Sequence, residues 1–130
     1  MTHPGRWRTV GIVLALGAGY DLVFGVAILG FTRSAASVLG LQVPSDPVYL
    51  YLNGVLLLLL AGLYAAAARE PERYRAIAPI SAGGRTIGFL LFVWAWAGGR
   101  PTTFLALGLA DLALAAVTII AWRRAVLLSD

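Results

Sequence analysis

The chain has 130 residues, of which 60% are hydrophobic and 12% are charged, and its mean hydropathy is +0.84. A soluble globular protein is closer to a quarter charged, because a surface that faces water needs polar cover. Ten basic and six acidic residues are too few for that, so we expect most of the surface to face lipid. All the basic residues are arginines at or near the ends of apolar segments, apart from one inside a segment. This pattern is typical of membrane topology signals and argues against a nucleic-acid partner.

The first apolar segment covers about residues 10–31 and follows Arg6 and Arg8. A signal peptide is the alternative interpretation, with residues 10–16 as its apolar part and a cleavage site shortly after them. The apolar pattern continues through residues 23–29, however, which completes a span of about 20 residues. We therefore expect a retained transmembrane helix.

The connection at 32–47 begins with a stretch, 35–41, that has the composition of a short helix lying in the membrane interface. Pro44 and Pro47 then prevent any helix from continuing, and Pro47 is well placed to start the next one. The second span is predicted at about 48–68, which includes the most apolar run of the chain.

A polar loop at 69–75 separates the second span from the third, which is predicted at about 76–97. A tight turn at 98–101 leads to the fourth span, at about 102–122. The sequence therefore predicts an all-α, four-helix transmembrane bundle in a single domain that takes up residues 1–130. Several aromatic residues fall near the predicted span ends, where an aromatic belt is expected: Tyr49, Tyr51, Tyr64, Trp94, Trp96 and Trp122.

The arginines predict the orientation of the bundle. With four spans, the two termini and the second loop lie on one side of the membrane, and that side carries seven arginines. The opposite side has only Arg33 and Arg100. The positive-inside rule then predicts that both termini lie in the cytoplasm. We accordingly expect a multi-pass protein of the bacterial inner (plasma) membrane. The seven are Arg6, Arg8, Arg69, Arg73, Arg75, Arg123 and Arg124.

Three ionisable side chains fall inside predicted spans. From the cytoplasmic side, Asp21 lies roughly 18 Å deep and Arg85 roughly 14 Å deep, and Asp111 also lies near the midplane. A lone charge at this depth costs at least about 2.5–3.5 kcal/mol. We therefore predict that the Arg85 guanidinium bridges the two carboxylates. Asn53, closer to the outer face, is a further candidate for this intramembrane polar cluster.

Small residues share the helix faces of these three charged side chains. Because small side chains let helices approach closely, the charges are expected to point into helix–helix contacts. The small neighbours are Gly17 and Gly25 around Asp21, Ser81 and Gly88 around Arg85, and Gly108 and Ala115 around Asp111.

Two interpretations of the cluster compete. In the first it is structural, and the protein is a non-enzymatic accessory or assembly component, or binds a small lipophilic ligand. In the second, the surplus of acid over base marks Asp21 or Asp111 as the titrating group of a proton-coupled small-molecule transporter working as a dimer. Either way the partners are the lipid bilayer and a second copy or a larger membrane complex. Arg69, Arg73 and Arg75 are candidates for contacts with lipid headgroups.

No cofactor or metal is expected. The chain has no cysteine, and no predicted span contains a histidine, so thiolate, haem and copper ligands are missing from the membrane region. No span pairs a nucleophile with a base, so an enzyme is not expected.

The overall plan resembles that of the DoxX-like group of small four-helix bacterial membrane proteins. The shared features are the chain length, the long first connection with Pro44 and Pro47, and polar residues placed singly in apolar helices. The resemblance covers the whole chain in outline and implies a four-helix fold. It implies no role for any particular residue.

Overall fold

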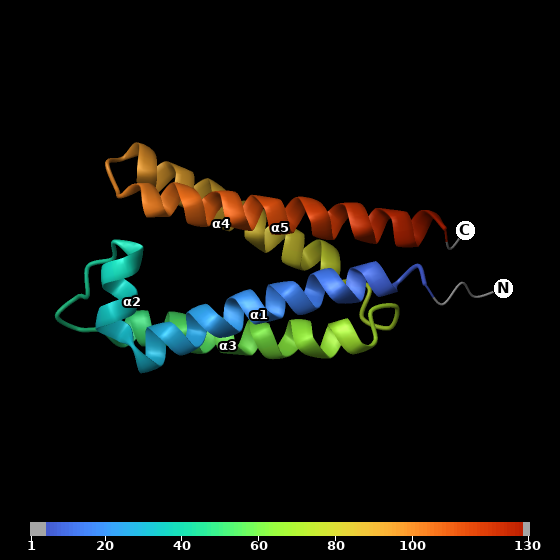
Figure 1. Cartoon of the computed structure of the whole chain (residues 1–130), viewed down its shortest axis with the longest axis horizontal. Helices are drawn as coiled ribbons and strands as arrows, with labels where there is room; N and C mark the ends of the chain where they lie inside the picture. The colour runs from blue at the N-terminus through green and yellow to red at the C-terminus, as the bar shows by residue number, and fades with distance from the viewer. Residues whose placement is uncertain (1–4, 129–130) are drawn as a thin grey trace.

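The computed structural model describes residues 5–128, and within that range the chain forms five α-helices (Figure 1). Four are long and apolar enough to cross a membrane, and the fifth, α2, is short and follows α1. At 1.5 Å per residue, even the shortest of the four spans about 30 Å, the thickness of a hydrocarbon core. The protein is therefore a small, four-span helical membrane protein. Its helices are α1 (Arg8–Gly30), α2 (Thr32–Leu39), α3 (Val48–Arg69), α4 (Ile77–Ala97) and α5 (Thr102–Leu127).

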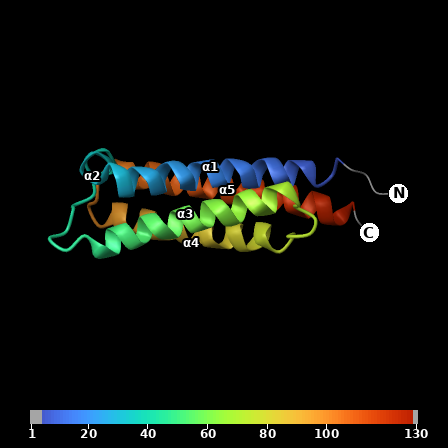
Figure 2. The ribbon, with the colours of Figure 1, turned by 90° about the horizontal axis from the view of Figure 1, so that it is seen from below.

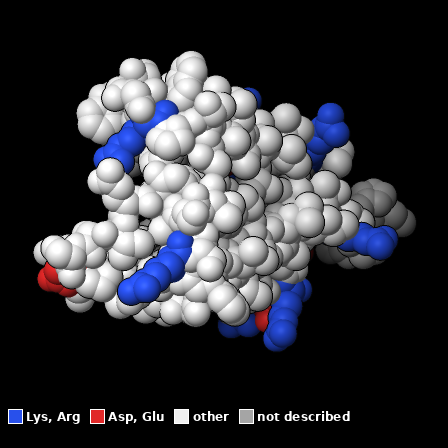
Figure 3. All heavy atoms as spheres, turned by 60° about the vertical axis from the view of Figure 1, so that its left-hand side comes forward, with Lys and Arg blue, Asp and Glu red and all other residues white. Residues whose placement is uncertain are grey.

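The surface of the bundle is as apolar as the composition predicts. Large hydrophobic side chains such as Leu16 of α1, Leu59 of α3 and Leu91 of α4 are exposed. Figure 3 shows a face that is mostly uncharged, with basic and acidic side chains scattered mainly around its edge. Such a surface is stable in lipid and not in water.

The long helices lie close to the predicted spans, with one clear difference at the C-terminal end. The fourth span was predicted to close near residue 122, whereas α5 continues to Leu127. Arg123 and Arg124 end the apolar run but not the helix, because basic side chains are favourable in the last turns of a helix. The two arginines therefore show where α5 leaves the lipid, whereas the end of the helix is set by its backbone hydrogen bonds.

The short helix α2 was predicted at 35–41 and is found at Thr32–Leu39. It ends at Gly40, whose φ of +67° is a left-handed conformation that suits glycine. The amide of Leu41 then donates to the carbonyl of Ala36 at 2.8 Å, which closes the helix end. Gly40 also lies against Pro101, where a Cβ would come within 2.7 Å of the proline ring.

The four long helices are arranged as two antiparallel pairs (Figures 1 and 2). In one pair α1 packs along α3, and in the other α4 packs along α5, while α1 also contacts α5. Within the first pair, a Cβ on Gly25 would lie 2.8 Å from Leu58 Cδ2, and a Cβ on Gly54 would lie 2.8 Å from Leu29 Cγ. Glycine is therefore what allows α1 and α3 to come this close.

The apolar core lies toward the end of the bundle where α1 begins and α5 ends. All four long helices contribute to it, so this end joins the two pairs through ordinary hydrophobic contact. Its buried members are Trp7, Val10, Val13, Leu14, Ala18, Tyr64, Ala67, Ala78, Ala121 and Ala125.

Candidate functional site

Arg85 connects the two helix pairs in the interior of the bundle. Its side chain is buried on α4, and its Nη1 donates a hydrogen bond to Asp111 Oδ1 on α5 at 3.0 Å. Its Nη2 donates to Asp21 Oδ2 on α1 at 3.1 Å and lies 3.3 Å from the Gly17 carbonyl oxygen, which also accepts. The predicted Asp21–Arg85–Asp111 bridge is therefore confirmed.

Glycines give the three charged groups room to meet. A Cβ on Gly88 of α4 would lie 2.8 Å from Asp111 Oδ2, closer than real Cβ contacts allow. A Cβ on Gly17 of α1 would lie 3.2 Å from Arg85 Nη2. The structure thus explains two of the small residues that the sequence places beside the charges: each leaves the space that a polar side chain of another helix occupies.

Two tyrosines flank the guanidinium, and neither was predicted to belong to the cluster. The Arg85 guanidinium carbon lies 5.3 Å from the centre of the Tyr20 ring on α1 and 5.7 Å from the centre of the Tyr64 ring on α3. Both distances are within the range of cation–π attraction. With Tyr64, all four long helices contribute to the cluster.

The prediction that Tyr64 belongs to an aromatic belt at the edge of its span is wrong. Tyr64 is buried and lies on the face of α3 that points into the bundle. Tyr20 could have been singled out because it precedes Asp21, but neighbouring residues in a helix point about 100° apart, so adjacency alone does not predict a shared contact.

Asn53 does not join the cluster. Its side chain is exposed on α3, and no hydrogen bond among residues 5–128 connects it to Arg85 or to either aspartate. The next residue, Gly54, is the one that faces α1. One step along a helix turns the side chain by about 100°, which takes Asn53 out of the interface.

The cluster is enclosed. Asp21, Arg85 and Asp111 are only 3%, 7% and 8% exposed. Each carboxylate accepts from Arg85 through one of its oxygens. With all three groups ionised the cluster would carry one net negative charge, since two carboxylates face one guanidinium.

Two threonine hydroxyl groups within the spans bind the backbone of their own helix. Thr86 and Thr118 each donate to the backbone carbonyl four residues earlier, at 2.8 Å and 2.6 Å. Such bonds satisfy a hydroxyl inside an apolar helix. Among residues 5–128, no group of three or more His, Cys, Asp or Glu side chains is placed to hold a metal ion.

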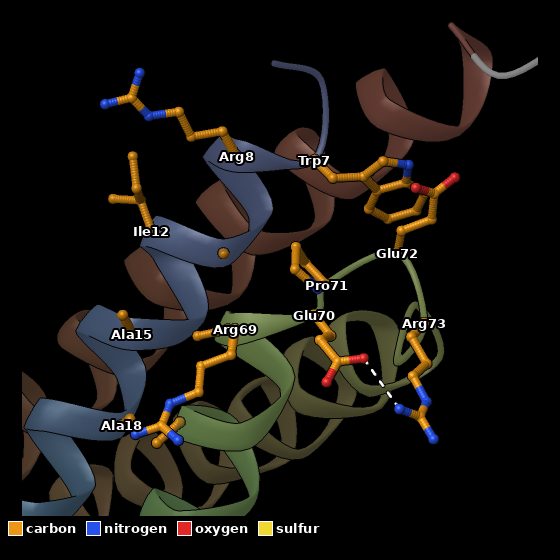
Figure 4. Close-up of a pocket in the computed structure, with 13 residues that line it drawn as sticks. Trp7, Arg8, Ile12, Ala15, Ala18, Arg69, Glu70, Pro71, Glu72 and Arg73 are labelled. Atoms are coloured by element: carbon orange, nitrogen blue, oxygen red, sulfur yellow. Dashed lines mark hydrogen bonds and ion pairs between the residues drawn. The ribbon is translucent and has the colours of Figure 1, made fainter. Parts of the chain in front are cut away.

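The three arginines predicted to contact lipid headgroups are not equivalent. Arg69 ends α3 and, with Arg73, lines a groove between α1 and α3 (Figure 4). Arg73 is paired with Glu70 at 3.1 Å, whereas Arg75 is exposed and lies outside that groove.

No protein-family model matches this chain, and comparison with curated proteins and with solved structures finds no match either. The site is therefore interpreted from its own geometry.

Proposed function

We propose that the protein is a non-enzymatic accessory or assembly component of the bacterial inner membrane, with a DoxX-like four-helix plan. In this proposal the Asp21–Arg85–Asp111 cluster holds the two helix pairs in a fixed relative position. The resulting rigid bundle presents its apolar faces to the bilayer, and to a second copy or a larger membrane complex.

The enclosed double ion pair of Arg85 is the observation that supports this role. One guanidinium reaches carboxylates on two different helices, and those helices belong to different pairs. Such a contact fixes both the rotation and the register of helices that are otherwise apolar on every side. A substrate site would need a path to the aspartates, whose side chains are almost fully buried in the bundle.

Substitution of the two aspartates tests this role. Asp21→Asn and Asp111→Asn each keep the shape of the side chain and lower the charge of the cluster. We expect both to unfold at a slightly lower temperature in detergent, by similar amounts, and to keep a native elution profile. If one of them left stability unchanged, the cluster would not be holding the pairs together.

The alternative is a proton-coupled transporter, and the surplus carboxylate is what favours it. Two carboxylates and one guanidinium leave one negative charge that a proton could neutralise. In that case either Asp21→Asn or Asp111→Asn should abolish pH-driven uptake in proteoliposomes while the fold stays intact. The structural role expects no such uptake from the unsubstituted protein.

The orientation belongs to the same proposal. Seven arginines lie toward the end where α1 begins and α5 ends, against Arg33 and Arg100 toward the other, so we place the arginine-rich end in the cytoplasm. Because the chain has no cysteine, single cysteines can report the topology. In intact cells, a membrane-impermeant maleimide should label Ser34→Cys and not Glu72→Cys. The reverse pattern would invert the assignment.

A further inference from the structure

A groove of about 1050 Å³ opens at the arginine-rich end of the bundle, between the start of α1 and the end of α3 (Figure 4). The helices come together here at Gly11, where a Cβ would lie 2.8 Å from the Ala68 carbonyl oxygen. The groove exists because the residues along it are small. Its small members are Gly11, Ala15 and Ala18 of α1 and Ala65 and Ala68 of α3.

Each helix carries an arginine at the end of the groove and apolar residues below it. On α1, Arg8 is followed at i+4 by Ile12 and at i+7 by Ala15, so the three share one face. On α3, Arg69 lies four residues after Ala65. In Figure 4, Arg69 extends from the end of α3 down along the groove, with its guanidinium drawn at the level of Ala18 of α1, while Arg8 points outward from the rim.

These two arginines have no acidic partner among residues 5–128. Glu70 and Glu72 also line the groove, but each is already paired with another arginine, Glu70 with Arg73 at 3.1 Å and Glu72 with Arg6 at 3.8 Å. Arg8 and Arg69 therefore leave an uncompensated positive charge in the groove. The small residues of α1 and α3 that line the groove form its apolar floor, which we call the trough.

Along α1, the lining of the groove changes from charged to apolar with depth in the membrane. Ala15 lies seven residues beyond Arg8 along α1, which is roughly 10 Å deeper. A ligand that fits this profile has a negative headgroup and an apolar chain that continues into the bilayer. A free phosphate ion would use the arginines but not the trough.

We propose that this groove binds an anionic phospholipid. The phosphate pairs with Arg69, whose planar guanidinium suits phosphate oxygens, and Arg8 adds positive charge at the rim. The upper part of an acyl chain lies in the trough over Ala15 and Ala65. The site is separate from the Asp21–Arg85–Asp111 cluster, so its test does not depend on the role proposed for that cluster.

Native mass spectrometry of the full chain, delipidated and then titrated with phosphatidylglycerol or phosphatidylcholine, tests the proposal. We expect phosphatidylglycerol to be retained preferentially. Arg69→Gln should weaken that retention about fivefold and Arg8→Gln/Arg69→Gln by more than tenfold, since each removes one favourable charge at the membrane surface. The matched control is Arg75→Gln/Arg123→Gln, which removes two arginines from the same end but outside the groove, and it should bind as the unsubstituted protein does.

A second variant distinguishes a lipid from a free anion. Ala15→Leu/Ala65→Leu fills the trough, keeps every charge and alters two exposed positions, so it should fold normally in lipid-free detergent. It should lose phosphatidylglycerol retention while the arginines remain. Three results would overturn the proposal: equal retention of the two lipids, an equal loss in the matched control, or full retention in the trough variant with displacement by inorganic phosphate alone.

Discussion

The contact between α1 and α3 consists of backbone and aliphatic side chains, whereas the two helix pairs meet in the interior through one arginine and two aspartates. At the first contact, Gly25 lies against Leu58 and Gly54 against Leu29. At the second, Arg85 reaches carboxylates at 3.0 Å and 3.1 Å. The first contact is spread over many weak interactions, so each substitution should cost only its share. The ionic contact depends on a single side chain, so its loss should weaken the junction of the two pairs at this level, while the apolar core at the end where α1 begins still joins them.

The largest expected effect is that of Arg85→Ala. This change leaves two buried carboxylates with no counter-charge, and removing one partner of a buried ion pair costs about 3–5 kcal/mol. We expect a steep fall in the unfolding temperature in detergent, followed by tryptophan fluorescence, with helix content largely kept because each helix is stable in an apolar medium. Arg100→Ala, in the exposed turn before α5, is the control. Equal stability of the two variants would show that the contact between the two helix pairs does not depend on charge.

Next in size are substitutions within a pair. Gly25→Leu and Gly54→Leu place a side chain where a Cβ already comes within 2.8 Å of a leucine of the facing helix. Overpacking of this kind costs about 1–3 kcal/mol. Gly62→Leu is the matched control, because a Cβ on Gly62 of α3 meets nothing within 4 Å. If Gly62→Leu were as unstable as the other two variants, close packing of α1 against α3 would not explain their loss of stability.

Gly88→Ala sharpens the comparison because this glycine belongs to a pair but touches the ionic cluster. The added Cβ would lie 2.8 Å from Asp111 Oδ2. We expect a loss of about 1 kcal/mol, since overpacking costs about 1–3 kcal/mol and the better helix propensity of alanine offsets about 1 kcal/mol. Gly84→Ala, one turn away with nothing within 4 Å, should be neutral or stabilising. If the clash acts through the carboxylate, Gly88→Ala should have no cost in an Asp111→Ala background, which a double-mutant cycle measures.

A loss of similar or smaller size is expected from Tyr20. Its ring lies 5.3 Å from the Arg85 guanidinium carbon, and a cation–π contact contributes about 0.5–2 kcal/mol. Tyr20→Leu should lower the unfolding free energy by about that amount, while Tyr20→Phe keeps a ring and should lose less. If the Tyr20→Leu and Tyr20→Phe variants had indistinguishable unfolding curves, the aromatic ring would not stabilise the contact between the two helix pairs.

The depth of each charged residue could be predicted from the sequence, because depth depends only on the number of residues from the end of a span. Asp21, Arg85 and Asp111 were placed at one level on that basis, and they meet there. Their glycine neighbours at i+3 and i±4 were also predictable, since that spacing defines a helix face. The length of α5 was not, because the apolar run ends before the helix does.

Which side chains share an interface was decided only by the tertiary structure. A helix in water reveals its buried face as an apolar stripe. A helix in lipid is apolar on every side, so the sequence of α3 gives no sign that Tyr64 points inward and Asn53 outward. The sequence by itself determined four spans, the uneven distribution of arginine between their ends and the common depth of three charges. The packing of α1 against α3 and of α4 against α5 set the rotation of each helix, because only contact between helices distinguishes one apolar face from another.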